Sequence, residues 1–262
     1  MQEFAEHLPV AVVLLGVLAG SFVAGFAGFG LSAAAGALLL HVLPAATAVP
    51  LMMLCSVVVQ VICLVYLRKT MDLRGSAPFL ISGAPALPIA VWILTNTHPD
   101  ILRRGFGAFL VVYCSYMLWS ARRRTTGKTA SPNSTETTEV RRPERLLTNA
   151  AFGFAGGLIG GLTAMPGATI SIWADIRGGD KTQRRAIVQP FILVMQVVAL
   201  LIMAGTGHLF HPELKQLFVV SIPAMLIGVA VGLYLFNRVP SDRFRLWVLV
   251  LILVSGMVML SR

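Results

Sequence analysis

The sequences FVAGFAGFGLSAAAG, from Phe22 to Gly36, and FAGGLIGGLTAMPGA, from Phe154 to Ala168, stand at matching places in the two halves of the chain. Each lies inside a long apolar segment that opens its half. Glycine in a helix interior costs about 1 kcal/mol relative to alanine, so both stretches predict broken helices. In a membrane, a broken helix is tolerated where the freed backbone groups meet protein or line a cavity. The pair therefore predicts a transporter's binding site, although the same glycines also suit close helix packing.

The composition is that of an integral membrane protein. Of the 262 residues, 56% are hydrophobic and 12% are charged, and the mean hydropathy is +0.81. Soluble proteins carry about 25% charged residues, whereas several apolar runs of this chain reach the ~20 residues that cross a bilayer. The net charge of +10 comes from basic residues in short loops between these runs. Since this is the positive-inside pattern, we expect the lipid bilayer and not nucleic acid as a partner.

Eight hydrophobic blocks are separated by polar segments. The blocks are Leu8–Leu43, Ala45–Leu67, Ala77–Thr95, Gly105–Ala121, Leu146–Ala174, Ala186–Gly205, Leu217–Phe236 and Leu246–Leu260. The one long polar stretch, Arg122–Arg145, is rich in Ser, Thr and charge and predicts a flexible linker. We therefore expect an N-terminal membrane repeat at 1–121, a cytoplasmic linker at 122–145 and a C-terminal membrane repeat at 146–262.

The two halves show weak internal similarity. An alignment with small gaps pairs Pro50 with Pro190 and places Ser56 opposite Gln196. Upstream, the same alignment pairs the glycines of the two breaks, Gly25 with Gly157 and Gly28 with Gly160. Internal repeats of this kind are common in secondary transporters.

The first block of each half is too long for one ordinary span, which leaves two topologies open. If every block crosses once and the N-terminus is inside, 12 of the 21 basic residues are cytoplasmic. If each first block is a hairpin broken at its glycines, the cytoplasmic side holds 17 of the 21. The positive-inside rule favours the second arrangement, in which both termini are outside and the halves are inverted. The predicted fold is thus an all-α membrane protein of two repeats, each opening with a re-entrant or discontinuous helix.

Helix breaks expose backbone N–H groups at the positive end of the helix dipole, which suits a small anion. Hydroxyl and amide side chains near the breaks, among them Gln60 and Thr169, would add donors. Arg185, which enters the sixth block, could form paired hydrogen bonds to a sulfonate, sulfite or carboxylate, or could only set topology. The predicted substrate-binding residues are Gly25, Gly28, Gly30, Ser32, Ser56, Gly157, Gly160, Gly161, Thr163, Pro166, Gly167, Arg185, Gln189 and Gln196.

The chain resembles the sulfite exporter TauE/SafE family of membrane permeases. The resemblance rests on the glycine-rich openings GFAGFG and GFAGGLIGG, on the segment AMPGATISIWADIRGGDKTQRRAIVQPF, and on the polar linker between two similar halves. It implies movement of sulfite, sulfoacetate or a related anion across the cytoplasmic membrane, and it places Arg185 and Gln189 in the region that bears the motifs. In the alignment above, Ala45 stands opposite Arg185 and Val49 opposite Gln189, so substrate contacts with two-fold symmetry are not expected.

No motif indicates an enzyme, a nucleotide site or a metal site, so we expect no cofactor and transport driven by gradients or by the membrane potential. Export of an anion down an inside-negative potential is the favoured direction. A coupled importer, a passive anion channel and a membrane scaffold without transport stay open as alternatives, as does a homodimer.

Overall fold

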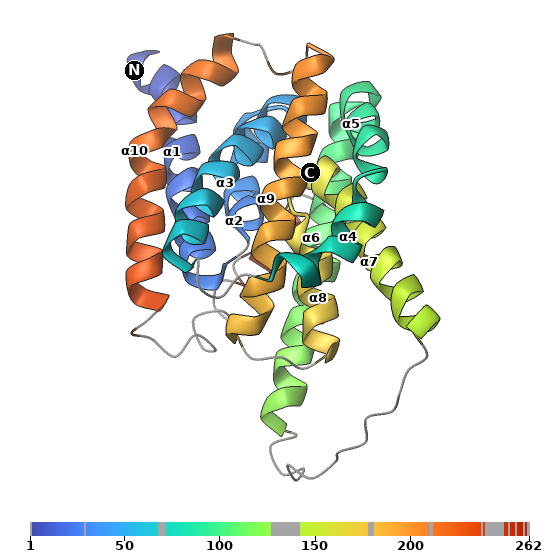
Figure 1. Cartoon of the computed structure of the whole chain (residues 1–262). Coiled ribbons are helices and arrows are strands. Elements are labelled where there is room, and N and C mark those ends of the chain that lie inside the picture. The colour runs from blue at the N-terminus through green and yellow to red at the C-terminus, as the bar shows by residue number, and fades with distance from the viewer. Residues whose placement is uncertain are drawn as a thin grey trace.

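The structure is a computed structural model that describes residues 2–28, 30–67, 72–126, 142–177, 181–207, 209, 212–236, 238, 249–250, 252–254, 256–258 and 260. These residues form helices joined by short turns, and they contain no strand. In chain order the helices are α1 (Gln2–Ala27), α2 (Leu31–Val42), α3 (Ala45–Leu67), α4 (Leu73–Gly83), α5 (Ala86–Asn96), α6 (Pro99–Thr126), α7 (Arg142–Thr163), α8 (Gly167–Arg177), α9 (Lys181–Gly205) and α10 (Pro212–Phe236). The predicted all-α membrane fold is confirmed (Figure 1).

Six of the described helices are long and apolar enough to cross a membrane. A seventh span results if α4 and α5, which meet at an angle of 53°, are counted as one bent span. In contrast, α2 and α8 have 12 and 11 residues. At 1.5 Å per residue each is shorter than about 20 Å, well below the ~30 Å of the hydrocarbon layer. Each half therefore opens with a long helix followed by a short one, as the glycine breaks predict.

The helix boundaries of the two halves repeat at a constant distance along the chain. The ends of α1 and α7, at Ala27 and Thr163, lie 136 residues apart. The same separation holds for the first residues of α2 and α8 and for those of α3 and α9. This register corrects the gapped alignment, because it pairs Gly28 with Ala164 instead of Gly160. Matching identical residues in a sequence so rich in glycine is a weak guide, whereas the breaks fix where the helices end.

The first long helix of each half packs against the third span of the other half. Helix α1 makes its most extensive contact with α10, and α7 makes its most extensive contacts with α4 and α5. Between these two groups, α3 packs against α9, and the pairs α1–α10 and α7–α4 lie on opposite sides of the molecule in Figure 1. This exchange makes the two halves one body.

Glycines allow these helix pairs to approach closely. A Cβ on Gly25 of α1 would lie 2.7 Å from the Val229 carbonyl oxygen of α10, and one on Gly228 would lie 2.5 Å from the Leu18 carbonyl oxygen. On α7, a Cβ on Gly157 would collide with the backbone of Gly83 in α4. Small residues at four-residue spacing are the usual device for bringing membrane helices together.

The third and fourth blocks differ in detail from the sequence prediction. The block Ala77–Thr95 is broken at Ala84 and Pro85, between α4 and α5, instead of forming one helix. Helix α6 continues to Thr126 and α7 begins at Arg142, so the predicted linker Arg122–Arg145 is helical at both ends. Residues 127–141 of that linker and much of the block Leu246–Leu260 lie outside the described residues.

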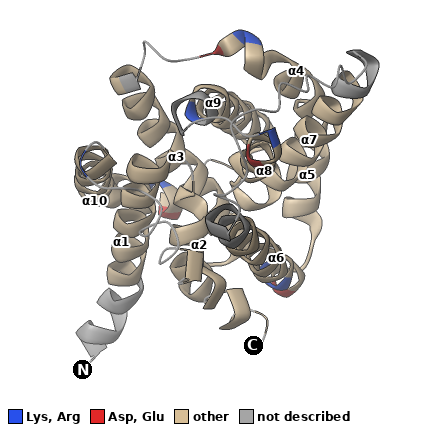
Figure 2. Ribbon diagram, turned by 90° about the horizontal axis from the view of Figure 1, so that it is seen from below, with Lys and Arg blue, Asp and Glu red and all other residues tan. Residues whose placement is uncertain are grey.

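The ends of the helices separate into two faces of the molecule. In Figure 1 α1 begins at the upper end, whereas the last turn of α6 and the first turn of α7 lie at the lower end. Figure 2 looks at this lower end, from which α8 and α9 are also seen. The start of α1 and the helix ends that flank residues 127–141 therefore lie at opposite ends of the molecule.

Candidate functional site

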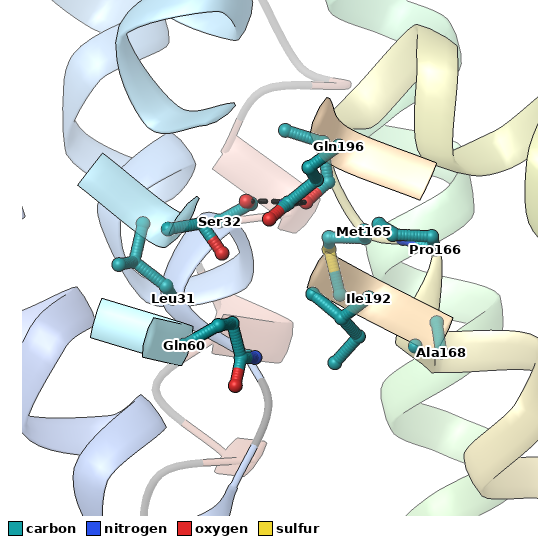
Figure 3. A pocket seen from close by; sticks show the side chains of 12 residues that line it. Leu31, Ser32, Gln60, Met165, Pro166, Ala168, Ile192 and Gln196 are labelled. Carbon is teal, nitrogen blue, oxygen red and sulfur yellow. Dashed lines mark hydrogen bonds between the residues drawn. The ribbon is translucent and has the colours of Figure 1, made fainter. Parts of the chain in front are cut away.

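A buried cavity lies where the two breaks face each other. Its lining combines residues of α2 and α3 with residues of the second break, α8 and α9: Gly30, Leu31, Ser32, Ser56, Gln60, Ala164, Met165, Pro166, Gly167, Ala168, Ile192 and Gln196. Figure 3 shows the two sets of side chains on opposite sides of the cavity. The cavity volume is about 10 Å³, close to the smallest that holds one water molecule.

The first break presents the N-terminus of α2 to the cavity. Gly28 and Gly30 have φ values of 85° and 97°, in the left-handed region that glycine adopts without strain. Gly30 is the N-cap of α2, and no side chain caps this helix. Because the first N–H groups of a helix have no partner within it, α2 directs unpaired donors and the positive end of its dipole toward the cavity.

The second break presents the N-terminus of α8 in the same way. Ala164 has a φ of 55°, unusual for a residue other than glycine, and Pro166 and Gly167 follow it in the lining. The Ala168 N–H donates to the Met165 carbonyl oxygen at 3.2 Å, which tightens the turn. Two helix N-termini thus converge on one small volume from opposite halves.

Two glutamine side chains hold the breaks at equivalent positions. Gln60 Nε2 donates to the Gly28 carbonyl oxygen at 3.5 Å, and Gln196 Nε2 donates to the Ala164 carbonyl oxygen at 3.0 Å. Both pairs obey the 136-residue register. Ser32 Oγ crosses between the halves and donates to the same Ala164 oxygen at 2.6 Å.

The amide oxygens of both glutamines are left without a partner among the described residues. Gln60 is 2% exposed and Gln196 is 1% exposed, and in each the Oε1 atom is buried and accepts no hydrogen bond. Because Nε2 of each amide is committed to a carbonyl oxygen, the orientation of the amide is fixed by its own hydrogen bond. Each of these two lining side chains therefore carries a buried acceptor without a partner.

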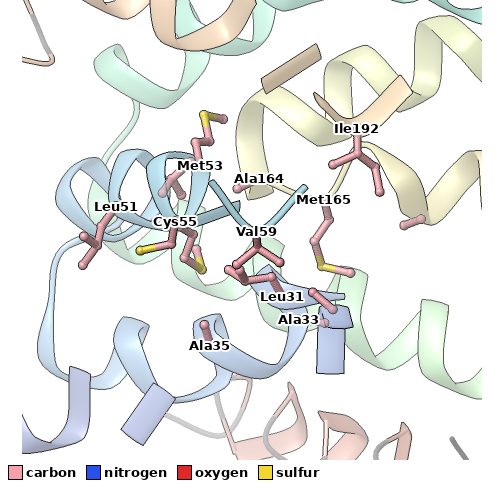
Figure 4. Close-up of a cluster of buried hydrophobic side chains, with 14 of the residues drawn as sticks. Leu31, Ala33, Ala35, Leu51, Met53, Cys55, Val59, Ala164, Met165 and Ile192 are labelled. Atoms are coloured by element: carbon pink, nitrogen blue, oxygen red, sulfur yellow. The ribbon is translucent and has the colours of Figure 1, made fainter. Parts of the chain in front are cut away.

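Apolar side chains of both halves close the site off from water. Leu31 and Val59 of the first half meet Met165 and Ile192 of the second in the buried cluster of Figure 4. All four are less than 5% exposed. In such surroundings hydrogen bonds and helix dipoles act more strongly than in water.

Arg185 lies beside the first break but outside the cavity lining. Its Nη2 donates to the carbonyl oxygens of Gly25 at 2.9 Å and Ala24 at 3.4 Å, and its guanidinium stacks on Phe236 at 4.2 Å from the ring centre. The last carbonyls of a helix have no partner within it and form the negative end of its dipole. Arg185 therefore caps the C-terminus of α1. Its Nε and Nη1 atoms are buried without a partner among the described residues.

Comparison with protein families identifies this arrangement. The model of the sulfite exporter TauE/SafE family matches residues 12–259 of the 262-residue chain. The chain belongs to the TauE/SafE family. This confirms the resemblance drawn from the sequence and makes the protein a multi-pass membrane permease of a transporter family. No curated protein and no solved structure gives a significant match.

The structure brings together about half of the site residues predicted for this TauE/SafE protein. Those in the lining are Gly30, Ser32, Ser56, Pro166, Gly167 and Gln196. Gly28 and Arg185 lie next to the lining. Gly160 packs against Pro166, because a Cβ added to Gly160 would lie 2.5 Å from the Pro166 Cβ. Thr163 donates through Oγ1 to the Ile159 carbonyl oxygen at 2.7 Å, and Gln189 is buried outside the lining.

Three of the predicted glycines belong instead to helix contacts. Gly25 faces α10, Gly157 faces Gly83 of α4, and Gly161 faces Ala90 of α5. For these positions the alternative interpretation, close helix packing, describes what the structure shows. Gly157 and Gly161 are four residues apart and so share the face of α7 that packs against α4 and α5.

Gln60 lines the cavity, although the sequence indicated it only as a further donor. Its signal was the 136-residue register, in which Gln60 and Gln196 correspond. The apolar lining residues Leu31, Ala164, Met165, Ala168 and Ile192 carry no such signal, because they resemble the rest of the membrane core.

Proposed function

We propose that this TauE/SafE protein is a secondary transporter that exports a small sulfur-containing anion, sulfite or an organosulfonate, across the cytoplasmic membrane. The observation that carries the proposal is the convergence of two helix N-termini, those of α2 and α8, on one buried cavity. Membrane transport itself follows from the family. The substrate and the direction rest on the chemistry of the site.

The polar groups of the site suit an anion. The uncapped N–H groups of α2 are aimed at the cavity, and Ser56 adds a buried hydroxyl. A sulfur oxyanion presents several acceptor oxygens around one centre, so it can be bound by donors that approach from both halves. Moving one negative charge outward gains about 2.3 kcal/mol per 100 mV when the inside is negative, which favours export.

The described conformation is closed. A cavity of about 10 Å³ holds little more than a water molecule, whereas sulfite has four heavy atoms. Binding therefore requires the two hairpins to move apart, and the breaks provide the points at which they can bend. Alternating access between inverted repeats is the corresponding mechanism, and the reciprocal packing of α1 on α10 and α7 on α4 and α5 supports it.

Arg185 is placed to take part when the site opens. The residue is 6% exposed, its side chain lies against Gly28, and two of its nitrogen atoms have no partner among the described residues. Release from the end of α1 would let it form the paired hydrogen bonds that arginine makes to oxyanions. We propose that Arg185 alternates between capping α1 and holding the anion.

Flux of labelled sulfite and small sulfonates into liposomes tests the proposal. Saturable uptake that is accelerated by unlabelled anion on the opposite side is the expected result for a carrier. Single-channel currents without saturation would show a channel, and net movement only toward the inside would show an importer. Liposomes whose flux equals that of empty liposomes for every anion would indicate a scaffold.

The proposed sidedness places the segment 127–141 in the cytoplasm and both termini outside. Cysteine labelling beside Glu3 and beside Arg262 in intact cells tests this topology. We expect both positions to react with an impermeant reagent and a cysteine beside Lys128 to be protected. Protection of either terminus would contradict the arrangement.

A further inference from the structure

We propose that the cavity recognises its anion in a form that still carries a proton, so that hydrogen sulfite, and not the sulfite dianion, is the species bound. The inference rests on the proposed function and specifies the protonation state of the transported anion. It comes from the hydrogen-bond acceptors of the site, which an anion without a donor group would leave unsatisfied.

Two residues that line the cavity from opposite halves carry buried acceptors. The Oε1 atoms of Gln60 and Gln196 belong to lining residues, are buried, and have no hydrogen-bond partner among the described residues. Neither amide can turn its NH₂ group inward without losing the bond to the Gly28 or the Ala164 carbonyl oxygen. A ligand that fills the site must therefore donate a hydrogen bond, or leave a buried oxygen unsatisfied.

A protonated oxyanion meets both demands of the site. Its bare oxygens accept from the N–H groups at the start of α2 and α8, and its hydroxyl donates to a glutamine Oε1. The dianion has no donor, and its second charge raises the cost of leaving water for an apolar site. Burying an acceptor without a partner costs enough to lower affinity by about tenfold.

The lining itself contains no titratable side chain. Around it, α3 carries Cys55 and Cys63 and α9 carries Arg185, side chain types that ordinarily titrate above pH 8. His41 of α2, with Asp175 and Arg177 of α8, lie near the far ends of their short helices. Dependence of binding on pH between 6 and 8 should therefore come from the ligand.

Equilibrium binding to the purified full-length protein tests the inference. The probes are sulfite and methanesulfonate, a monoanion that has no proton to lose in this range. We expect the affinity for sulfite to fall by about tenfold per pH unit once the dianion predominates, since the dianion would not compete. The affinity for methanesulfonate should stay constant, and the variant His41→Gln should keep both profiles.

The outcomes separate this inference from the proposed function. Sulfite affinity that is constant or rises with pH would overturn the protonated-anion proposal and leave anion transport intact. Failure of both probes to bind at any pH would overturn both proposals. The pH dependence of sulfite affinity in the unaltered protein decides between these outcomes. The test therefore does not depend on whether a variant folds.

Gln60→Met and Gln196→Met remove the acceptors with little change of length. In each variant we expect the ratio of the affinity for hydrogen sulfite to that for methanesulfonate to fall by about tenfold. A purely structural role would weaken both ligands equally and leave their ratio unchanged, which would count against the proposal. Gln216→Met, on the exposed surface of α10, is the matched control and should keep the ratio.

Discussion

The two breaks stand at equivalent places in the halves but differ in backbone conformation and in residues. In the first, between α1 and α2, the left-handed positions are Gly28 and Gly30. In the second, between α7 and α8, the left-handed position is Ala164, and Pro166 precedes the new helix. A left-handed alanine costs about 1–2 kcal/mol, whereas glycine adopts this conformation without that cost.

The difference shows how each break is stabilised. The Ala164 carbonyl oxygen accepts from both Ser32 and Gln196, so two hydrogen bonds offset the strain at the second break. The first break has one weaker bond from Gln60, together with Arg185, which caps α1 and fills the space beside Gly28. Neutral groups thus hold the second break, whereas a buried cation lies beside the first.

The largest effect is expected at Gly28. In Gly28→Ala the new methyl group would collide with the Arg185 side chain, at a φ of 85°. Strain and overpacking together should destabilise the protein by about 2–5 kcal/mol and abolish flux. Thermal unfolding in detergent and liposome flux measure the two effects.

Gly207 provides the control for backbone strain alone. It also has a positive φ, 79°, and a Cβ there would meet no atom within 4 Å. Gly207→Ala should therefore cost only about 1–2 kcal/mol. Equal losses at the two positions would show that contact with Arg185 is irrelevant at the first break.

Arg185→Ala should have the next largest effect. It removes a charge-assisted hydrogen bond from the end of α1, at a cost of about 2–3 kcal/mol, and we expect transport to be lost. Arg185→Lys keeps the charge but not the planar fork, so it should weaken anion binding markedly while the protein stays folded.

The matched control is Arg238→Ala. Arg238 also stacks on an aromatic ring of α10, Tyr234, at 4.4 Å, but it is exposed. Exposed stacking contributes about 0.5–1 kcal/mol. Unchanged binding and flux in purified Arg185→Ala would mean that this arginine only sets topology.

A smaller effect is expected for Ser32→Ala, which removes the hydrogen bond from Ser32 Oγ to the Ala164 carbonyl oxygen. The Ala164 oxygen keeps its bond from Gln196, so the loss should be about 1 kcal/mol. Ser221→Ala is the control, because the buried Ser221 hydroxyl has no partner among the described residues. Ser221→Ala should leave the stability unchanged or raise it slightly. A larger loss of stability at Ser221 than at Ser32 would contradict a stabilising role for the Ser32–Ala164 hydrogen bond.

The smallest effect should come from Ala164→Gly. Relief of the left-handed alanine is nearly balanced by the greater freedom of glycine in the unfolded chain, so the change should stay within about 1 kcal/mol. Thermal unfolding measures this change. A large loss of stability would mean that the Ala164 methyl group has a packing role that its φ does not reveal.

Helix lengths and breaks could be predicted from the sequence because they depend on local composition. The block Ala45–Leu67 coincides with α3, and both first blocks divide within the glycine-rich stretches, although the second divides at residues 164–166, beyond Gly160. The bend at Pro85 was missed because an apolar run hides where neighbouring helices require a turn. It lies where α7 packs against both α4 and α5.

The site was harder to predict than the fold, because residue type does not say which face of a helix a residue occupies. Gly30 and Gly157 look alike in sequence, yet one lines the cavity and the other packs against α4. Gln60 became recognisable only when the helix ends supplied the register. Arg185 was singled out in the sequence as it enters the sixth block, but its cap on α1 depends on a tertiary contact that no local pattern encodes.

The exchange of partners between the halves also has a consequence for biosynthesis. Gly25 of α1 packs against Gly232 of α10, and α10 begins 185 residues after α1 ends. This face of α1 therefore has no partner helix until α10 has been synthesised. At about 5–20 residues per second, the ribosome needs roughly 10–40 s to make that stretch. During this interval the nascent first half lacks its permanent neighbour. Lipid, the insertion machinery or another nascent chain must cover that face until α10 has been made.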